Sequence, residues 1–288
     1  IMNIICTGNK DKKDFYDYLD RIIKHINAFG THDIYVDEYV SNDIDSINAQ
    51  YESLYSNEIQ FDFAISIGGD GALLSAVRRM KDRQLPVLGI HIGNLGFLNT
   101  ATKKNYIETI NNILNSKTIK TDNKSLVEVK FINKDNENIH FFALNEIFIN
   151  QSTVSRVLSL RVSIDDVLLN TYRCDGLIVS TPTGSTAYSL SAGGPIINLD
   201  VNGYVITPVS PVSLSSRSIV INDSSNIEIT CNADISQISI FADGQESDII
   251  LDGSIVNIFK SKSCAKIIKT STDISYFSRL RSQLGWNK

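Results

Sequence analysis

An aspartate stands inside a run of glycines, Gly-Gly-Asp-Gly at residues 68–71, and it is the residue of this chain best suited to chemistry. Residues 62–67 before it have the composition of a buried strand, and residues 72–79 after it have helical spacing. A glycine-rich turn between a strand and a helix presents backbone N–H groups and a helix dipole to a phosphate. Asp70 puts a negative charge there, so it is a candidate for holding a divalent cation or for accepting a proton from an attacking hydroxyl.

Asp70 also has a purely structural interpretation. Aspartate is a preferred N-cap residue, and this one directly precedes a helical turn. The neighbouring glycines can serve as turn residues with positive φ. The residues alone leave the capping role and the chemical role open, although three glycines around one aspartate exceed what a turn requires.

A second polar stretch covers residues 173–194 and contains many small and hydroxyl-bearing side chains. A buried strand at 176–180 feeds a loop of serine, threonine and glycine, which is expected to lead into a helix. Small residues let a ligand approach the backbone, and hydroxyls both donate and accept hydrogen bonds. Tyr188 offers a ring for stacking. Each residue alone has an ordinary role in a turn or in the core, but the cluster favours a binding site.

The pair Asn145-Glu146 interrupts an apolar run that is expected to form one strand over residues 139–149. Neighbouring side chains on a strand point to opposite faces, so one of the two should face inward. A buried amide or carboxylate needs partners, and ribose hydroxyls would suit a carboxylate acceptor. An edge strand or a bulge would explain the pair equally well.

Composition sets limits on the function. The chain has 288 residues, 42% hydrophobic and 20% charged, with a net charge of −5, which describes a globular protein and argues against a nucleic-acid binder. No apolar stretch is long enough to span a bilayer. The four cysteines form no Cys-x-x-Cys pair, which argues against structural zinc and favours reduced thiols in the cytoplasm. Walker-type, Gly-x-Gly-x-x-Gly and Gly-x-Ser-x-Gly motifs are all absent from the sequence.

The order of the elements predicts an α/β plus mostly-β protein. Residues 1–100 alternate strands and helices, which indicates a Rossmann-like parallel α/β domain, with Asp70 and residues 93–97 beyond the carboxyl ends of its strands. Residues 101–270 change to the two-residue period of a β-rich, sandwich-like domain. Residues 271–288 return to helical spacing and are expected to pack back on the N-terminal domain. Helices are expected at 14–26, at 43–54 (a weak one), at 72–79, at 105–114 and at 274–284.

Four segments together resemble the NAD kinase family, in the family's order. They are residues 68–71, the turn Gly-Asn-Leu-Gly-Phe at 93–97, Asn145-Glu146, and the run from Asp175 to Tyr188 that includes Thr-Pro-Thr-Gly-Ser-Thr-Ala-Tyr. The tail at 275–286 also resembles the end of many bacterial members. The glycine loop alone is shared with phosphofructokinases and lipid kinases, whereas the run that ends at Tyr188 is far more specific.

The resemblance implies phosphorylation of the 2′-hydroxyl on the adenosine ribose of NAD, with ATP or polyphosphate as donor and a divalent cation, usually Mg²⁺. It implies that Asp70 is the general base, that Asn145 and Glu146 hold the adenosine portion, and that Tyr188 lies near the nicotinamide. It assigns the remaining substrate contacts to Gly71, Phe97, Arg156, Arg173, Asp175, Thr186, Ala187, Ser191 and Gln245. No metal-ligating side chain is assigned. The family assembles as homodimers or homotetramers, and neither nucleic acid nor membrane is an expected partner.

Three positions depart from the family pattern. His91 stands where many members have Asn, Ala72 replaces the usual Thr, and Val212 stands where many bacterial members have His. None of these is the proposed base. Two other functions stay open at this point: a lipid or sugar kinase of the same glycine-loop superfamily, and a non-catalytic sensor that binds NAD or NADP.

Overall fold

The computed structural model describes residues 1–40, 50–56, 58–93, 96–151, 157–232, 237–270 and 274–286. The chain divides into two compact units, one formed by Ile1–Asn123 with Ala265–Lys288 and the other by Lys124–Cys264. The first unit is α/β and the second is β-rich, which confirms the expected fold class. The unit limits differ from the expected ones at residues 100 and 270, because helix α3 (Tyr106–Leu114) and Ile268 share the core of the first unit.

The first unit is built on a parallel sheet. Its strands run in the order β5-β4-β1-β2-β3, with β1 at Asn3–Gly8, β2 at Asp33–Asp37, β3 at Gln50–Glu52, β4 at Phe63–Gly68 and β5 at Pro86–His91. The short strand β6 (Ala101–Thr102) and the end of β18 (Ser254–Ile268) pair with β5, also in parallel. Every residue of β4 is buried, as expected for a parallel strand that is covered on both faces.

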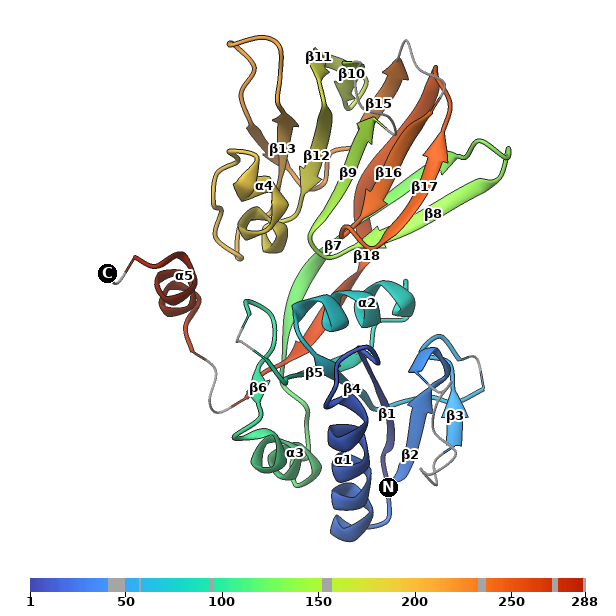
Figure 1. Cartoon of the computed structure of the whole chain (residues 1–288), viewed down its shortest axis with the longest axis vertical. Coiled ribbons are helices and arrows are strands. Elements are labelled where there is room, and N and C mark those ends of the chain that lie inside the picture. The colour runs from blue at the N-terminus through green and yellow to red at the C-terminus, as the bar shows by residue number, and fades with distance from the viewer. Residues whose placement is uncertain are drawn as a thin grey trace. The chain divides into compact units, whose positions relative to one another are not determined.

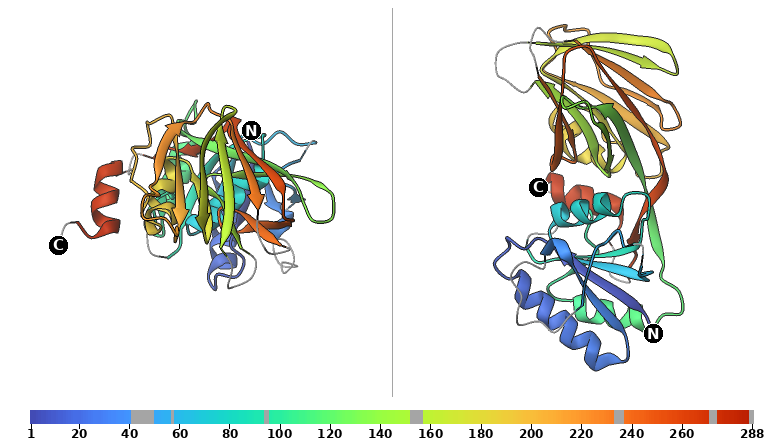
Figure 2. Two further views of the ribbon diagram at one scale, coloured as in Figure 1. Left: turned by 90° about the horizontal axis from the view of Figure 1, so that it is seen from above. Right: turned by 90° about the vertical axis from the view of Figure 1, so that its right-hand side faces the viewer.

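Helices cover both faces of this sheet, as Figures 1 and 2 show. Helix α1 (Phe15–Phe29) and α3 lie on one face, and their buried side chains join one core cluster with the strands. Helix α2 (Asp70–Met80) lies on the other face and contacts β1, β4 and β5. A 3₁₀ turn, η1, follows β2 at Glu38–Val40. The tail helix α5 (Tyr276–Leu284) starts at the N-cap Ser275 and ends at Gly285, which adopts a left-handed conformation.

The weak helix expected at 43–54 is wrong where it can be checked. Residues 41–49 lie outside the described residues, and Gln50–Glu52 form strand β3 instead. Tyr51 pairs with Val36 of β2, so an open sheet edge overrides the weak local helical preference.

The second unit is a β-sandwich. One sheet runs β14-β13-β12-β9-β16-β17 and is antiparallel throughout. Its strands are β9 (Glu146–Gln151), β12 (Gly176–Ser180), β13 (Gly203–Val209), β14 (Ile219–Asn222), β16 (Ile238–Ala242) and β17 (Glu246–Ile250). The other sheet holds β7 (Thr121–Ile132), β8 (Asn138–Ala143), β10 (Leu158–Ile164), β11 (Val167–Cys174), β15 (Ile227–Asn232) and most of β18. One apolar core draws on both sheets. The 3₁₀ turn η2 (Thr183–Thr186) and the short helix α4 (Tyr188–Ser191) follow β12.

Two features of the second unit correct the sequence-based expectations. The run at 139–149 is two strands, because the chain leaves the sheet of β8 after Ala143 and enters the sheet of β9 at Glu146. Strand β13 was not expected, although it is buried along most of its length. No described helix is long and apolar enough to cross a membrane.

Candidate active site

Asp70 is the first residue of α2, and its carboxylate does not cap that helix. The N-cap position belongs to Gly69, and no side chain caps the helix there. The Asp70 carboxylate instead accepts hydrogen bonds from the loop after β5: Oδ2 from the Phe97 backbone N–H at 2.6 Å, and Oδ1 from the Asn99 side-chain amide at 2.7 Å. Oδ1 also accepts longer bonds from the backbone N–H groups of Leu98 (3.2 Å) and Asn99 (3.4 Å). The helix-capping interpretation is therefore wrong for this side chain.

The sheet explains why the two loops meet. Strands β4 and β5 are neighbours, with Gly68 opposite His91, so the loops beyond their carboxyl ends lie side by side. Gly96 permits the close approach, since a Cβ at that position would lie 2.2 Å from Asp70 Oδ2. Consecutive backbone N–H groups form a concave site for an anion. The result is a half-buried carboxylate held in one orientation, with acceptor capacity left on Oδ2 among the described residues.

His91 lies behind this loop at the end of β5. Its side chain is buried, and the Cε1 atom lies 3.8 Å from where a Cβ of Gly69 would be. Burial lowers the pKa of His91, and the nearby charge of Asp70 offsets only part of that effect. At neutral pH the imidazole is therefore uncharged and adds no cation beside the Asp70 carboxylate.

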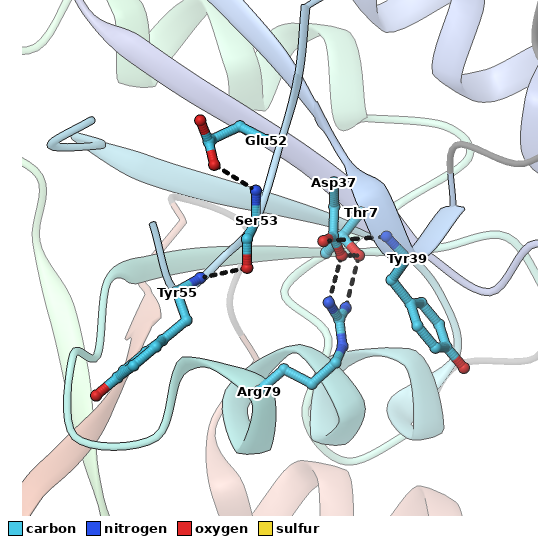
Figure 3. Close-up of polar contacts among 7 residues, drawn as sticks. All are labelled: Thr7, Asp37, Tyr39, Glu52, Ser53, Tyr55 and Arg79. Carbon is cyan, nitrogen blue, oxygen red and sulfur yellow. Dashed lines mark hydrogen bonds and ion pairs between the residues drawn. The ribbon is translucent and has the colours of Figure 1, made fainter. Parts of the chain in front are cut away.

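The position of α2 is fixed at its other end by an ion pair between the partly buried Arg79 and the buried Asp37, drawn in Figure 3. Arg79 Nη1 donates to Asp37 Oδ2 at 2.5 Å, and Arg79 Nη2 donates to Thr7 Oγ1 at 2.9 Å. Thr7 in turn donates to Asp37 Oδ2 at 2.5 Å. The Arg79 guanidinium also lies 4.4 Å from the centroid of the Tyr39 ring. These contacts anchor the helix that begins at Asp70 to strands β1 and β2.

The second unit holds its own cluster around Asn145 and Glu146. Asn145 lies in the turn between β8 and β9, and Glu146 is the first residue of β9. A buried carboxylate, Asp243, accepts their backbone N–H groups at 2.7 and 3.3 Å. Asp243 also accepts the N–H of Leu144 at 3.1 Å and donates its own N–H to the Glu146 carbonyl at 3.0 Å. Asp243 therefore fixes the backbone that presents both side chains.

The hydroxyl-rich loop after β12 holds the same turn from the other side. Thr181 donates its backbone N–H to the Asn145 carbonyl at 2.8 Å and its hydroxyl to the Leu144 carbonyl at 2.5 Å. Gly184 is required by this contact, since a Cβ there would lie 2.2 Å from the Asn145 carbonyl oxygen. The pair Asn145-Glu146 and the loop are thus one structure.

Glu146 is buried, and its environment favours the protonated form. Burial first, and the nearby charge of Asp243 second, raise the pKa of Glu146 to about 8, although the Tyr188 backbone N–H opposes the shift. The carboxyl therefore keeps its proton at neutral pH and offers one donor besides its acceptors. Its Oε2 atom has no hydrogen-bond partner among the described residues, which leaves a buried polar atom for a ligand to satisfy.

Tyr188 stands beside this pair at the start of α4. Its side chain is 41% exposed, and its ring packs edge-on against Phe148 of β9 with the centroids 5.0 Å apart. The ring is therefore held in place by a neighbour while much of it remains open to solvent. A planar ligand group can stack on such a ring.

The other expected site residues are placed as follows. Gly71 is exposed in the first turn of α2, Arg173 is exposed near the end of β11, and Asp175 is half-buried between β11 and β12. Thr186, Ala187 and Ser191 belong to the η2–α4 segment, and Gln245 is exposed in the turn between β16 and β17. Arg156 lies outside the described residues.

Asp243 was missed by the sequence-based interpretation. The signal was present as Asp-Gly-Gln at 243–245, directly after a strand of alternating residues. A turn aspartate is usually a local hydrogen-bond acceptor, so only the pairing of β16 with β9 identifies the N–H groups that it holds. Among the described residues, no three His, Cys, Asp or Glu side chains come together as metal ligands.

Comparison with known proteins gives a consistent result. The family model described as ATP-NAD kinase N-terminal domain matches residues 8–118, and the model described as ATP-NAD kinase C-terminal domain matches residues 144–270. An NAD kinase of Treponema denticola is 34% identical over 271 residues, which cover 93% of this chain and 92% of that protein. An NAD kinase of Wigglesworthia glossinidia brevipalpis is 40% identical over 227 residues, covering 79% of this chain and 76% of that protein.

Solved structures extend the similarity to three dimensions. A yeast NADH kinase crystallised with NADH superimposes with a TM-score of 0.88 at 26% identity, covering 100% of this chain and 89% of that one. An NAD kinase from Archaeoglobus fulgidus in complex with ATP has the same fold, with a TM-score of 0.73 at 24% identity and coverage of 99% and 98%.

Proposed function

This chain belongs to the NAD kinase family, and we propose that Asp70 is the general base of its reaction. The reaction transfers the terminal phosphoryl group of ATP to the 2′-hydroxyl of the adenosine ribose of NAD, and it yields NADP and ADP. Family membership sets aside the lipid and sugar kinases and the non-catalytic sensor as alternatives. The observation that carries the proposal is the half-buried Asp70 carboxylate, fixed by the 97–99 loop at a glycine-rich helix start.

The chemistry explains why a fixed carboxylate is needed. A ribose hydroxyl is a weak nucleophile at neutral pH, and a positioned base that takes its proton contributes about 10²- to 10⁴-fold to the rate. Oδ2 of Asp70 accepts one hydrogen bond among the described residues, so it is the oxygen proposed to receive the proton. The backbone N–H groups at the start of α2 face the phosphates in this scheme.

Substrate recognition is assigned to the second unit. Asn145 and Glu146 would bind the adenosine part of NAD, and the unpartnered Oε2 of Glu146 supports a contact with a substrate hydroxyl or amine. Tyr188 would stack on the nicotinamide, which its exposed and buttressed ring supports. Further substrate contacts are proposed for Gly71, Phe97, Arg156, Arg173, Asp175, Thr186, Ala187, Ser191 and Gln245, on the resemblance alone.

We propose Mg²⁺ as the divalent cation, carried on the phosphates of the donor. Mg²⁺ keeps several waters and usually binds one or two carboxylates together with substrate phosphates, so it needs no cage of protein side chains. Asp70 keeps its proposed role as the base, so the donor's phosphates and water would supply the ligands of the cation. When bound, the cation neutralises charge on the transferred group. Polyphosphate is the alternative donor.

Assembly as a homodimer or homotetramer is also proposed. Strand β11 ends the order of its sheet, and its residues Val167 and Leu168 are 70% and 47% exposed. An exposed apolar edge strand suits pairing with another chain. Light scattering of the purified protein would measure the assembly.

The compartment that we propose for this protein is the reducing cytoplasm. The four free cysteines, three of them buried, fit that compartment.

The test of the base compares wild-type protein with Asp70→Asn, using NAD, ATP and Mg²⁺ and measuring NADP. We expect the variant to fold and to bind NAD with a near-normal KM, while turnover falls by about 100-fold or more. Asp17→Asn, which changes an exposed carboxylate on α1, is the matched control and should keep full turnover. Near-normal turnover in Asp70→Asn would remove Asp70 from the role of base.

A further inference from the structure

The 97–99 loop is held from two sides. On one side, the N–H groups of Phe97 and Asn99 donate to the Asp70 carboxylate. On the other side, the carbonyls of the same two residues accept hydrogen bonds from Arg279 Nη1, at 3.3 Å for Asn99 and at a closer approach for Phe97. The guanidinium of Arg279, on the tail helix α5, is therefore hydrogen-bonded to the loop that orients the proposed base.

Arg279 is unusual for an arginine on a short terminal helix, because it is only 8% exposed. Among the described residues it forms no ion pair with a carboxylate, so its charge is offset by carbonyl oxygens alone. Removing a charge from water costs desolvation free energy, unless hydrogen-bond or ionic partners in the protein offset that cost. A tail that merely covered the protein surface would be better served by an apolar residue at this position.

The local sequence delivers Arg279 to its place. Ser275 caps the start of α5 by accepting the Ser278 backbone N–H, and Gly285 ends the helix with φ of 70°. Leu280, the neighbour of Arg279, is also buried. The next arginine, Arg281, is exposed and donates to Ser278 within the same helix. One face of the helix thus holds a buried arginine and leucine, while the other face is solvated.

We propose that Arg279 is a positioning residue for the reaction. It fixes the carbonyls of Phe97 and Asn99, so that the N–H groups of the same loop hold the Asp70 carboxylate in the orientation for proton transfer. The guanidinium also polarises the peptide group that joins Phe97 to Leu98, which strengthens the donation from the Leu98 N–H to Asp70 Oδ1. The proposal rests on the proposed role of Asp70 as the base. If Arg279 acts in this way, helix α5 contributes to the chemical step.

The test measures NADP formation by full-length Arg279→Ala, Arg279→Lys and Arg281→Ala proteins, together with the thermal unfolding midpoint of each. We expect Arg279→Ala to lower kcat by about 10- to 100-fold, because small misplacement of a catalytic group has effects of that size. The KM for NAD should change little, since the substrate contacts assigned to the second unit are intact. Arg279→Lys should keep an intermediate kcat, and Arg281→Ala should match wild type.

Two further measurements separate positioning from mere stability. Guanidinium added at concentrations below those that unfold the protein should restore part of the kcat of Arg279→Ala, and should leave Arg281→Ala unchanged. In an Asp70→Asn background, Arg279→Ala should cause little additional loss, because both changes act on one group.

Other outcomes contradict the proposal. Wild-type kcat in a folded Arg279→Ala protein would overturn it, as would full additivity with Asp70→Asn or a loss confined to KM. A lowered unfolding midpoint without rescue by guanidinium would mean that Arg279 is only structural. Failure of the proposed base would be seen separately, as normal turnover in Asp70→Asn while wild type makes NADP.

Discussion

At the scale of single residues, the sequence singled out Asp70 as a candidate but did not predict the residues that bind its carboxylate. A carboxylate in a glycine loop after a buried strand left a capping role and a chemical role open. The hydrogen bonds of the side chain exclude the first, and the second stays a prediction. The donors that orient the carboxylate come from residues 97–99, and the cation behind them comes from residue 279. Such long-range partners depend on strand order, and no local pattern predicts them.

Glu146 leads to a prediction about how the stability of the protein depends on pH. The pKa of Glu146 is about 8 in the folded protein, against an ordinary value of 4.5. Between these two pH values the folded protein therefore holds one more proton than the unfolded chain. Stability therefore falls as the pH rises through the interval. In Glu146→Gln the penalty is absent, so its unfolding free energy should exceed that of wild type by about 4 kcal/mol near pH 8 and by about 1 kcal/mol or less near pH 5.

Urea unfolding followed by circular dichroism at several pH values measures this difference. Glu108→Gln, at an exposed position on α3, is the matched control and should follow wild type at every pH. Parallel curves for Glu146→Gln and wild type would mean that Glu146 is ionised in the folded protein, and that its burial is relieved by a partner.

At the scale of elements, periodicity predicted the buried strands and long helices but not the places where the chain changes sheets. The apolar run at 139–149 satisfies a strand pattern throughout, and the break at Asn145 is imposed by Asp243, almost a hundred residues later. Strand β13 was overlooked because Asn202-Gly203 precedes its apolar stretch and proline and serine follow it, a composition that resembles a loop. Tertiary pairing, rather than local propensity, decides both cases.

The anchor of α2 gives a prediction at this scale. Asp37 is fully buried and pairs with the partly buried Arg79, so Asp37→Asn leaves a guanidinium without its counter-charge. Breaking a buried pair in this way typically costs about 3 kcal/mol or more. We expect that loss of unfolding free energy in urea titrations. The exposed pair Lys24–Asp20 is the matched control, and Asp20→Asn should cost about 0.5 kcal/mol or less.

An equal and small effect in both variants would show that α2 is fixed by its apolar face alone. The buried side chains of that face include Leu73, Val77 and Met80. If Asp37→Asn is destabilising as expected, turnover should also fall, because the helix that begins at Asp70 loses one of its supports.

At the scale of the whole molecule, the division into an α/β part and a β-rich part could be predicted because the period of the apolar residues changes along the chain. The tail at 271–288 was expected to pack on the first unit, but the return of the chain to that unit by way of a strand was not. The last residues of β18 pair with Pro86 and Val87 of β5, and the buried Ile268 belongs to the core of the first unit. A strand that starts in one unit and ends in another has no signature in periodicity.

That return leads to a prediction with two truncated chains. A chain ending at Cys264 loses the end of β18 that pairs with β5. It also loses Ile267 and Ile268, which are at most 4% exposed. Burial of such a side chain is worth about 1.5 to 3 kcal/mol, and a folded domain has only about 5 to 15 kcal/mol in total. We expect the first unit of this chain to be unfolded, seen as a loss of helical circular dichroism.

A chain ending at Thr270 keeps these contacts and loses only the tail. It retains the hydrogen bonds between Thr100 and the Ile268 carbonyl and between Thr270 and the Thr100 carbonyl. It should therefore fold, with a thermal midpoint lowered only by the loss of the buried Leu280, yet show the low kcat expected for Arg279→Ala. Unfolding of this shorter chain would assign the tail a structural role, whereas normal turnover would mean that the 97–99 loop holds Asp70 without help from α5.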